Sequence, residues 1–187
     1  MPRAAAAVET GLGDPKLVWV DDTGSLKRRI RYLAEAVKLG VEDPESHRIV
    51  AEAVRGCPGN DQSCEVRTWF QWLKNRVRYE MQGPGDIFTT LRRTLDRGAA
   101  DCDQAIVSLA TGLVIMGYTA GARVVSVDGN YWNHIYTLVG VPRDAPSGLF
   151  PLELTIGPDG TPETAMPFWE IPPALRKEER DFLLQIA

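Results

Sequence analysis

The sequence predicts an α+β fold, in which a group of helices comes first and an antiparallel sheet follows. Apolar residues recur at helical spacing as far as Gly117, and the pattern then changes to short strand-like runs separated by turns. Helices that precede the strands, rather than alternate with them, are typical of the α+β class. The 187 residues are enough for one domain with a substantial core and an added terminal layer.

The composition is that of an ordinary globular protein, with 44% apolar and 25% charged residues. The formal net charge of -4 gives no general attraction to nucleic acid or to an anionic membrane. Apolar runs fall short of the roughly 20 residues that a spanning helix needs, and the start of the chain lacks the pattern of a secretory signal. We therefore expect a cytoplasmic location in the producing cell, with neither nucleic acid nor membrane as partner.

Four regions are expected along the chain. Residues 1–24 form an arm with one short strand at 17–20, and residues 25–61 form a helical extension that begins near Ser25, a candidate N-cap. The core spans 62–165, and a helical tail covers 166–187. The core is expected to contain helices at 62–77 and 102–116, a short helical piece at 89–97 within a polar connection, and strands at 122–127, 133–139 and 149–155.

A basic cluster, Lys27-Arg28-Arg29 with Arg31, lies on the first helix of the extension. The same helix carries a clear apolar stripe, so the cluster is interpreted as a solvated face. Docking of an acidic partner is the alternative interpretation.

The chain has three cysteines, an odd number that does not indicate a disulfide scaffold. Cys57 and Cys64 straddle a turn between two helices and are expected to be separate reduced thiols. A disulfide under oxidising conditions is one alternative, and a metal site with His47 is another. A zinc site requires four ligands at tighter spacing, so neither a metal nor another cofactor is expected.

Cys102 carries the main chemical signal, because it occupies the first turn of the apolar helix at 102–116. A thiol is a useful nucleophile as thiolate, and a helix N-terminus or a nearby imidazolium lowers its pKa. Asp101 and Asp103 would oppose the thiolate if they pointed at it. Capping the helix or binding neighbouring loops is the role expected for them.

His134 is the candidate base for Cys102. The other histidine, His47, is expected to face solvent, whereas His134 stands in a strand that can pack across the helix start. A histidine base needs an acceptor that fixes its tautomer and orientation. Glu153 lies among apolar residues of the next strand, and a buried carboxylate requires a partner. Pairing with Arg123 or Arg143 is the structural alternative for Glu153.

This order of cysteine, histidine and acid resembles the transglutaminase-like superfamily of papain-related cysteine enzymes. Residues 98–103 match the family's glycine–x–glycine–aspartate–cysteine–aspartate signature, residues 133–136 its histidine strand, and residues 152–155 its leucine–aspartate–x–threonine strand. The resemblance covers about residues 62–160. It implies a papain-like fold, with the nucleophile helix packed on an antiparallel sheet.

Two positions depart from the family pattern. Ala100 replaces the second glycine and restricts the backbone before the nucleophile. Glu153 replaces the usual aspartate, and its extra methylene displaces the carboxylate by about 1 Å, a shift that can cost on the order of a hundredfold in rate.

The resemblance implies a cysteine protease, amidase or acyltransferase that acts on a peptide or protein amide through a Cys102–His134–Glu153 triad and a thioester. The oxyanion would be held by the Cys102 backbone N–H and one upstream donor, for which Gln71, Trp72 and Gln82 are candidates. Trp132 is the candidate aromatic at the mouth of the site.

A second hypothesis is a structural or assembly protein that keeps this fold with little or no activity. Small members of the superfamily occur in bacteria and in bacteriophage genomes. The arm and the tail would suit a component, for example of a phage particle, that docks on assembly partners through its termini.

Overall fold

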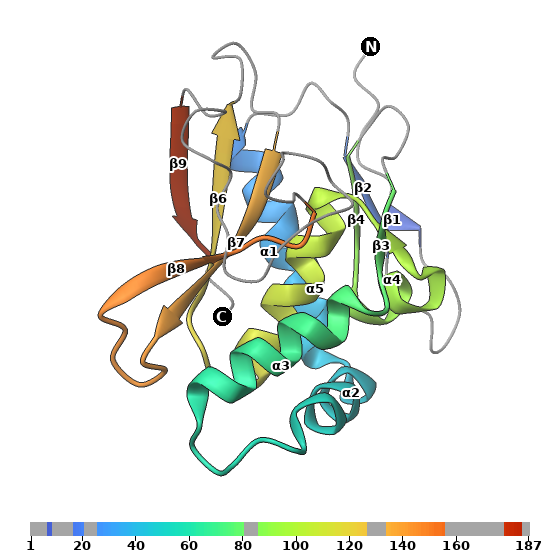
Figure 1. Cartoon of the computed structure of the whole chain (residues 1–187). Helices are drawn as coiled ribbons and strands as arrows, with labels where there is room; N and C mark the ends of the chain where they lie inside the picture. Colours follow the sequence, from blue (N-terminus) through green and yellow to red (C-terminus); the bar gives the residue numbers. More distant parts are fainter. Residues whose placement is uncertain are drawn as a thin grey trace, which may run out of the picture.

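The computed structural model describes residues 7–8, 17–20, 26–80, 86–126, 134–155 and 178–184 of the chain. It confirms the predicted α+β class (Figure 1). The helices are α1 (Leu26–Glu42), α2 (Pro44–Val54), α3 (Gln62–Lys74), α4 (Leu91–Arg97) and α5 (Cys102–Ile115). The strands are β1 (Ala7–Val8), β2 (Leu17–Val20), β3 (Arg78–Tyr79), β4 (Asp86–Thr89), β5 (Ala99–Ala100), β6 (Ala120–Ser126), β7 (His134–Val141), β8 (Gly148–Leu152) and β9 (Glu178–Leu183).

The main sheet is antiparallel and has the strand order β8-β7-β6-β9. His134, the first residue of β7, pairs with Val125 of β6. On the other side of β7, Thr137 pairs with Leu152, the last residue of β8. The chain that continues beyond β8 therefore runs back alongside the start of β7, which carries Glu153 toward His134.

Helix α5 is the centre of the fold, and it lies between the main sheet and the helices α1 and α3 (Figure 1). Its sequence is apolar on nearly every side, so the helix is buried almost along its whole length. Gly112 allows α3 to approach closely, because a Cβ atom there would lie 2.2 Å from the Trp69 ring. The Trp69 Nε1–H also donates to the carbonyl of Leu109 at 3.1 Å, which fixes α3 against α5.

A pair of short strands leads the chain into α5. Gly98 ends α4 with a positive φ of 66°, a conformation that favours glycine. The next two residues form β5, which pairs in parallel with β3, and the Glu80 N–H donates to the Ala100 carbonyl at 2.9 Å. Ala100 thus has an ordinary strand conformation. A glycine, which the transglutaminase-like signature has at this position, is not required for it.

The predicted helical tail is wrong where the structure describes the tail, because Glu178–Leu183 forms strand β9 at the edge of the main sheet. Its backbone pairs with β6, and Arg123 of β6 binds Asp181 with two hydrogen bonds of 2.6 and 2.8 Å. A free sheet edge and a cross-strand ion pair outweigh the weak helical signal of this segment.

Three further strands form a small sheet outside the main sheet, in the order β1-β2-β4. The strand expected at 17–20 is present as β2, and it pairs with β4 and β1. Strand β4 was not predicted, and its residues were expected to belong to a polar connection. Its four residues are too few to show the alternation of apolar and polar side chains that indicates a strand.

The expectation of separate thiols at Cys57 and Cys64 is also wrong, since the two residues form a disulfide with a Cα–Cα distance of 5.6 Å. The turn between α2 and α3 brings them together. The disulfide removes both sulfurs from the alternative metal site with His47. Within the described ranges, no group of three or more histidine, cysteine or acidic side chains is arranged to hold a metal ion.

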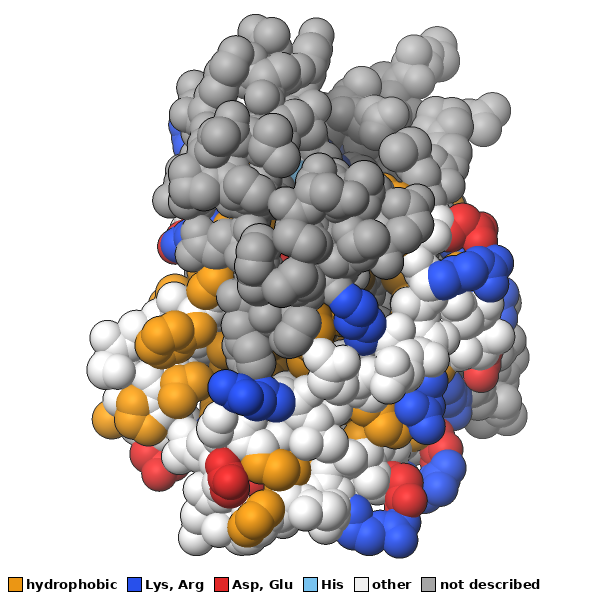
Figure 2. All heavy atoms as spheres, viewed as in Figure 1, with side chains coloured by type: hydrophobic (Ala, Val, Ile, Leu, Met, Phe, Trp, Pro, Cys, Tyr) orange, Lys and Arg blue, Asp and Glu red, His pale blue; other side chains and the backbone are white. Residues whose placement is uncertain are grey.

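The exposed surface carries charges of both signs. On the face shown in Figure 2, lysine and arginine side chains alternate with acidic ones over the coloured part of the molecule. None of the helices in the described part of the chain has the length and apolarity needed to cross a membrane.

Candidate active site

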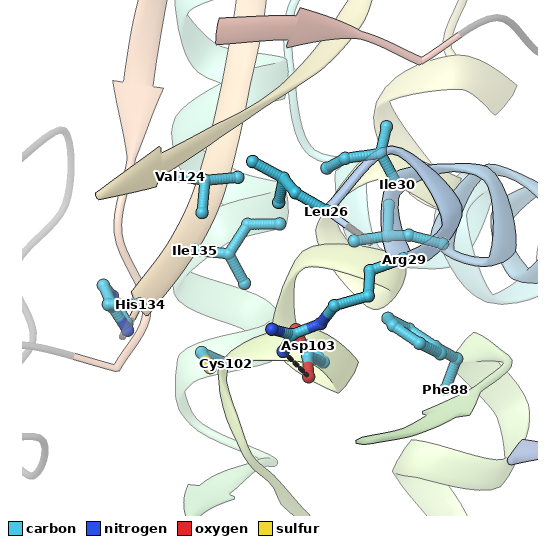
Figure 3. A pocket seen from close by; sticks show the side chains of 10 residues that line it. Leu26, Arg29, Ile30, Phe88, Cys102, Asp103, Val124, His134 and Ile135 are labelled. Atoms are coloured by element: carbon cyan, nitrogen blue, oxygen red, sulfur yellow. Dashed lines mark ion pairs between the residues drawn. The ribbon is translucent and has the colours of Figure 1, made fainter. Parts of the chain in front are cut away.

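Cys102 is the first residue of α5 and lines a small pocket at the helix start. The side chain of Asp101 caps this helix by accepting a hydrogen bond from the Gln104 N–H at 3.0 Å, as predicted for one of the two aspartates. The pocket lies where α1, β4, α5, β6 and β7 meet (Figure 3). Its lining residues are Leu26, Arg29, Ile30, Leu33, Phe88, Cys102, Asp103, Val124, His134 and Ile135.

His134 lines the same pocket as Cys102 and contacts Glu153. The His134 Nε2 atom is 2.6 Å from the Glu153 Oε2 atom. Because an ionised carboxylate only accepts hydrogen bonds, this contact places the proton of a neutral imidazole on Nε2. Nδ1 is then the ring nitrogen with a free lone pair, and it is the one that can act as a base.

Glu153 is held by Thr155 as well as by His134. The carboxylate is buried, with 1% of the residue exposed. Its Oε1 atom accepts hydrogen bonds from the Thr155 N–H at 2.7 Å and from the Thr155 hydroxyl at 2.8 Å. The longer side chain is therefore held at both oxygens, one by Thr155 and one by His134. The structure favours His134 over Arg123 or Arg143 as its partner.

The role of Thr155 was missed in the sequence. The residue is visible there as the last position of the matched motif Leu152-Glu153-Leu154-Thr155. A threonine two residues after a buried carboxylate is able to bind it locally with both its N–H and its hydroxyl, and this spacing was the available signal.

The environment of the Cys102 thiol disfavours the thiolate. Burial raises its pKa well above the ordinary value, and the negative charges of Asp103, Asp101 and Glu153 raise it further. The backbone N–H of Ile135 acts in the opposite direction through a hydrogen bond to the sulfur. The pKa of Cys102 is therefore shifted upward, opposite to the direction expected from the helix N-terminus, and burial is the largest cause. The thiol is consequently protonated at neutral pH.

Asp103 and Arg29 form an ion pair across the pocket, with 3.8 Å between Oδ2 and Nη2 (Figure 3). Asp103 is 6% exposed and lies next to the nucleophile. The interpretation of the basic cluster as a solvated face is correct for Lys27, Arg28 and Arg31, which are exposed. It is wrong for Arg29, which turns inward and lines the pocket.

The predicted oxyanion and substrate residues are not gathered at Cys102. Gln71 and Trp72 line a separate depression on α3. There Trp72 stacks on Trp69, with 5.5 Å between the ring centroids, and carries the Arg76 guanidinium over its face. Gln82 and Trp132 lie outside the residues that the structure describes.

Comparison with known proteins finds a solved structure whose backbone is similar to that of this chain. No family model and no curated protein matches the chain. Among solved structures, a protein from Cytophaga hutchinsonii described as a "putative cysteine protease" matches 90% of this chain and 70% of its own length. The two share 12% sequence identity, with a TM-score of 0.47. The residue assignments below therefore depend on the geometry of this chain alone.

A cysteine at the start of a buried helix faces an antiparallel sheet, which presents a histidine on one strand and an acid just after the next. The packing of the cysteine helix on an antiparallel sheet agrees with the fold class that the sequence predicted.

Proposed function

We propose that this chain is a cysteine-dependent hydrolase or acyltransferase that acts on amide bonds. The observation that carries the proposal is the buried His134–Glu153 pair of 2.6 Å, whose histidine shares a pocket with the Cys102 thiol. A histidine oriented by a buried acid beside a nucleophile is the arrangement that nucleophilic acyl transfer requires.

The proposed reaction begins with a protonated thiol. His134 Nδ1 takes the thiol proton as the sulfur attacks the carbonyl carbon of the amide, and Glu153 stabilises the imidazolium that forms. The tetrahedral intermediate collapses when the C–N bond breaks and His134 gives its proton to the leaving amine. The acyl group is then a thioester on Cys102. Water releases it as an acid, or a second amine releases it as a new amide.

The backbone supplies electrostatic assistance to these steps. The Cys102 N–H lies in the first turn of α5, where N–H groups lack partners within the helix. We assign it as a donor to the oxyanion. The Ile135 N–H stabilises the sulfur when it becomes negative.

Turnover of a chromogenic ester and of a peptide library tests the proposal. The variants are Cys102→Ser, His134→Gln and Glu153→Gln, and the matched control is His47→Gln, because His47 is exposed on α2. We expect the three site variants to lose about a hundredfold or more of kcat/KM, while the control keeps the wild-type value. Equal activity in His134→Gln and His47→Gln would contradict the triad.

One observation favours the second hypothesis, a weakly active or inactive assembly component. The raised pKa of Cys102 leaves little thiolate in the resting chain. The two proposals separate in the same assay. An assembly component, of a phage particle or another complex, shows no His134-dependent turnover and associates with partner proteins equally well when Cys102 is replaced by serine.

A further inference from the structure

We propose that Arg29 is a positioning residue of the active site, which offsets the negative charge of Asp103 so that the neighbouring Cys102 thiol can ionise during attack. This inference rests on the proposed function, since it concerns how the same thiol becomes reactive. It also brings α1, which lies outside the region of family resemblance, into the catalytic pocket.

The placement of Arg29 distinguishes it from the other basic residues of its helix. Lys27, Arg28 and Arg31 are exposed, whereas the Arg29 side chain is 29% exposed and extends from α1 toward the start of α5. Figure 3 shows the guanidinium reaching Asp103 next to Cys102. The aliphatic residues Leu26, Ile30 and Leu33 of the same helix line the rest of this wall, so α1 holds Arg29 in place.

Negative charge predominates around the thiol. Helix α5 contributes Asp101 and Asp103, and the chain after β8 contributes Glu153. Arg29 on α1 and His134 on β7 are the basic side chains among the residues that line the pocket. Strands β4 and β6 face the pocket with the apolar Phe88 and Val124.

His134 and Arg29 pair with different carboxylates, Glu153 and Asp103. His134 is committed to Glu153 through the contact of 2.6 Å. Asp101 is engaged in capping the helix. Asp103 remains as a buried carboxylate directly after the nucleophile, and Arg29 is the cation that meets it. A buried carboxylate without that cation would repel a thiolate strongly, because charges interact more strongly where water is excluded.

Alkylation kinetics test this role on the intact chain. The Cys57–Cys64 disulfide leaves Cys102 as the free cysteine, so uptake of iodoacetamide reports on this thiol alone. The rate is measured from pH 6 up to the pH at which it levels off for wild type, Arg29→Gln and Arg29→Lys, with Arg28→Gln as the matched control on the exposed face. Asp103→Asn and the double variant Arg29→Gln/Asp103→Asn complete a cycle.

We expect Arg29→Gln to slow alkylation about tenfold below the midpoint of the pH profile, which corresponds to a midpoint raised by about one pH unit. The Lys variant and Arg28→Gln keep most of the wild-type rate. Asp103→Asn speeds alkylation, and Arg29→Gln has little further effect in that background.

Two results would overturn the inference. One is an equal slowing at every pH, including the alkaline plateau, which indicates altered access rather than altered charge. The other is an undiminished Arg29→Gln effect in the Asp103→Asn background. Thermal unfolding of each variant shows whether it is folded, and Arg29→Met, which removes the charge but keeps the apolar stem, replaces Arg29→Gln if that variant is not.

Failure of this inference is distinguishable from failure of the proposed function. Ester turnover that depends on His134, together with alkylation that ignores Arg29, supports the function and rejects the role of Arg29. Alkylation that responds to Arg29, in a chain without His134-dependent turnover, shows that Arg29 tunes the thiol and contradicts the proposed enzyme.

Discussion

Glu153 depends on a neighbouring residue to act at the position of a shorter acid. Thr155 occupies one carboxylate oxygen with two hydrogen bonds, which leaves the other oxygen aimed at His134. In the proposed mechanism the Thr155 hydroxyl is a positioning group, since it fixes the acid that in turn fixes the base.

Replacing Thr155 with valine removes this hydroxyl at nearly constant volume. We expect kcat to fall about tenfold and the free energy of unfolding to fall by about 1 kcal/mol, the usual contribution of one buried hydrogen bond. Thr155→Ser keeps the hydroxyl and should stay close to wild type. Steady-state kinetics and urea denaturation measure the two effects.

Thr137→Val is the matched control, because the Thr137 hydroxyl is buried on β7 without a hydrogen-bond partner among the described residues. Its loss should not lower stability. Equal behaviour of Thr155→Val and Thr137→Val would contradict the role given to Thr155.

The raised pKa of Cys102 links stability to alkaline pH. The thiol loses its proton near pH 8.5 in the unfolded chain, but at higher pH in the folded one. The stabilisation is therefore fully present below about pH 8.5 and is lost as the pH rises through the folded pKa. Wild type should lose free energy of unfolding between pH 8 and 10 more steeply than Cys102→Ser. Parallel urea-denaturation profiles for the two proteins would show that the pKa is unshifted.

At the scale of elements, the position of α5 depends on its close approach to α3. A methyl group at Gly112 would lie 2.2 Å from the Trp69 ring, and both residues are buried. We expect Gly112→Ala to lower the free energy of unfolding by about 2 kcal/mol, as overpacking of a core does.

Gly56→Ala is the matched control, because nothing lies within 4 Å of a Cβ atom at that exposed position. It should change stability little. A Gly112→Ala protein as stable as Gly56→Ala would contradict the packing described between α3 and α5.

The disulfide between Cys57 and Cys64 secures the turn between α2 and α3. Titration of the native chain with a thiol reagent should find one free cysteine, and the reduced, unfolded chain should show three. The double variant Cys57→Ser/Cys64→Ser should lose about 2 kcal/mol of stability, as expected for a short closed loop. Three reactive thiols in the native protein would show that Cys57 and Cys64 are separate thiols and would contradict the disulfide.

At the scale of the whole molecule, the sequence predicted the parts that carry strong local patterns. The helix at 102–116 has an N-terminal cap and apolar periodicity, and it appears within one residue of its expected end. The pairing of His134 with Glu153 was also predictable, since a buried acid and a histidine on successive strands need each other.

The remaining features depend on partners distant in the sequence. Strand β9 is recognisable as a strand only through the edge of β6 that it covers. Arg29 resembles the exposed Arg28 beside it, and only the packing of α1 against α5 directs it to Asp103. The spacing of Cys57 and Cys64 allows a disulfide, but the turn that joins them decides it.

The proposed function depends on the formation of a thioester on Cys102 with the help of His134. Mass spectrometry of the intact chain and its peptides, sampled within the first turnovers with 4-nitrophenyl acetate, detects this intermediate. We expect one acetyl group on the peptide that contains Cys102 in wild type and in His47→Gln, with its formation slowed about a hundredfold or more in His134→Gln. Acetylation of Cys102 at the same rate with and without His134, or no acetylation of Cys102 at all, would contradict the proposed role of His134.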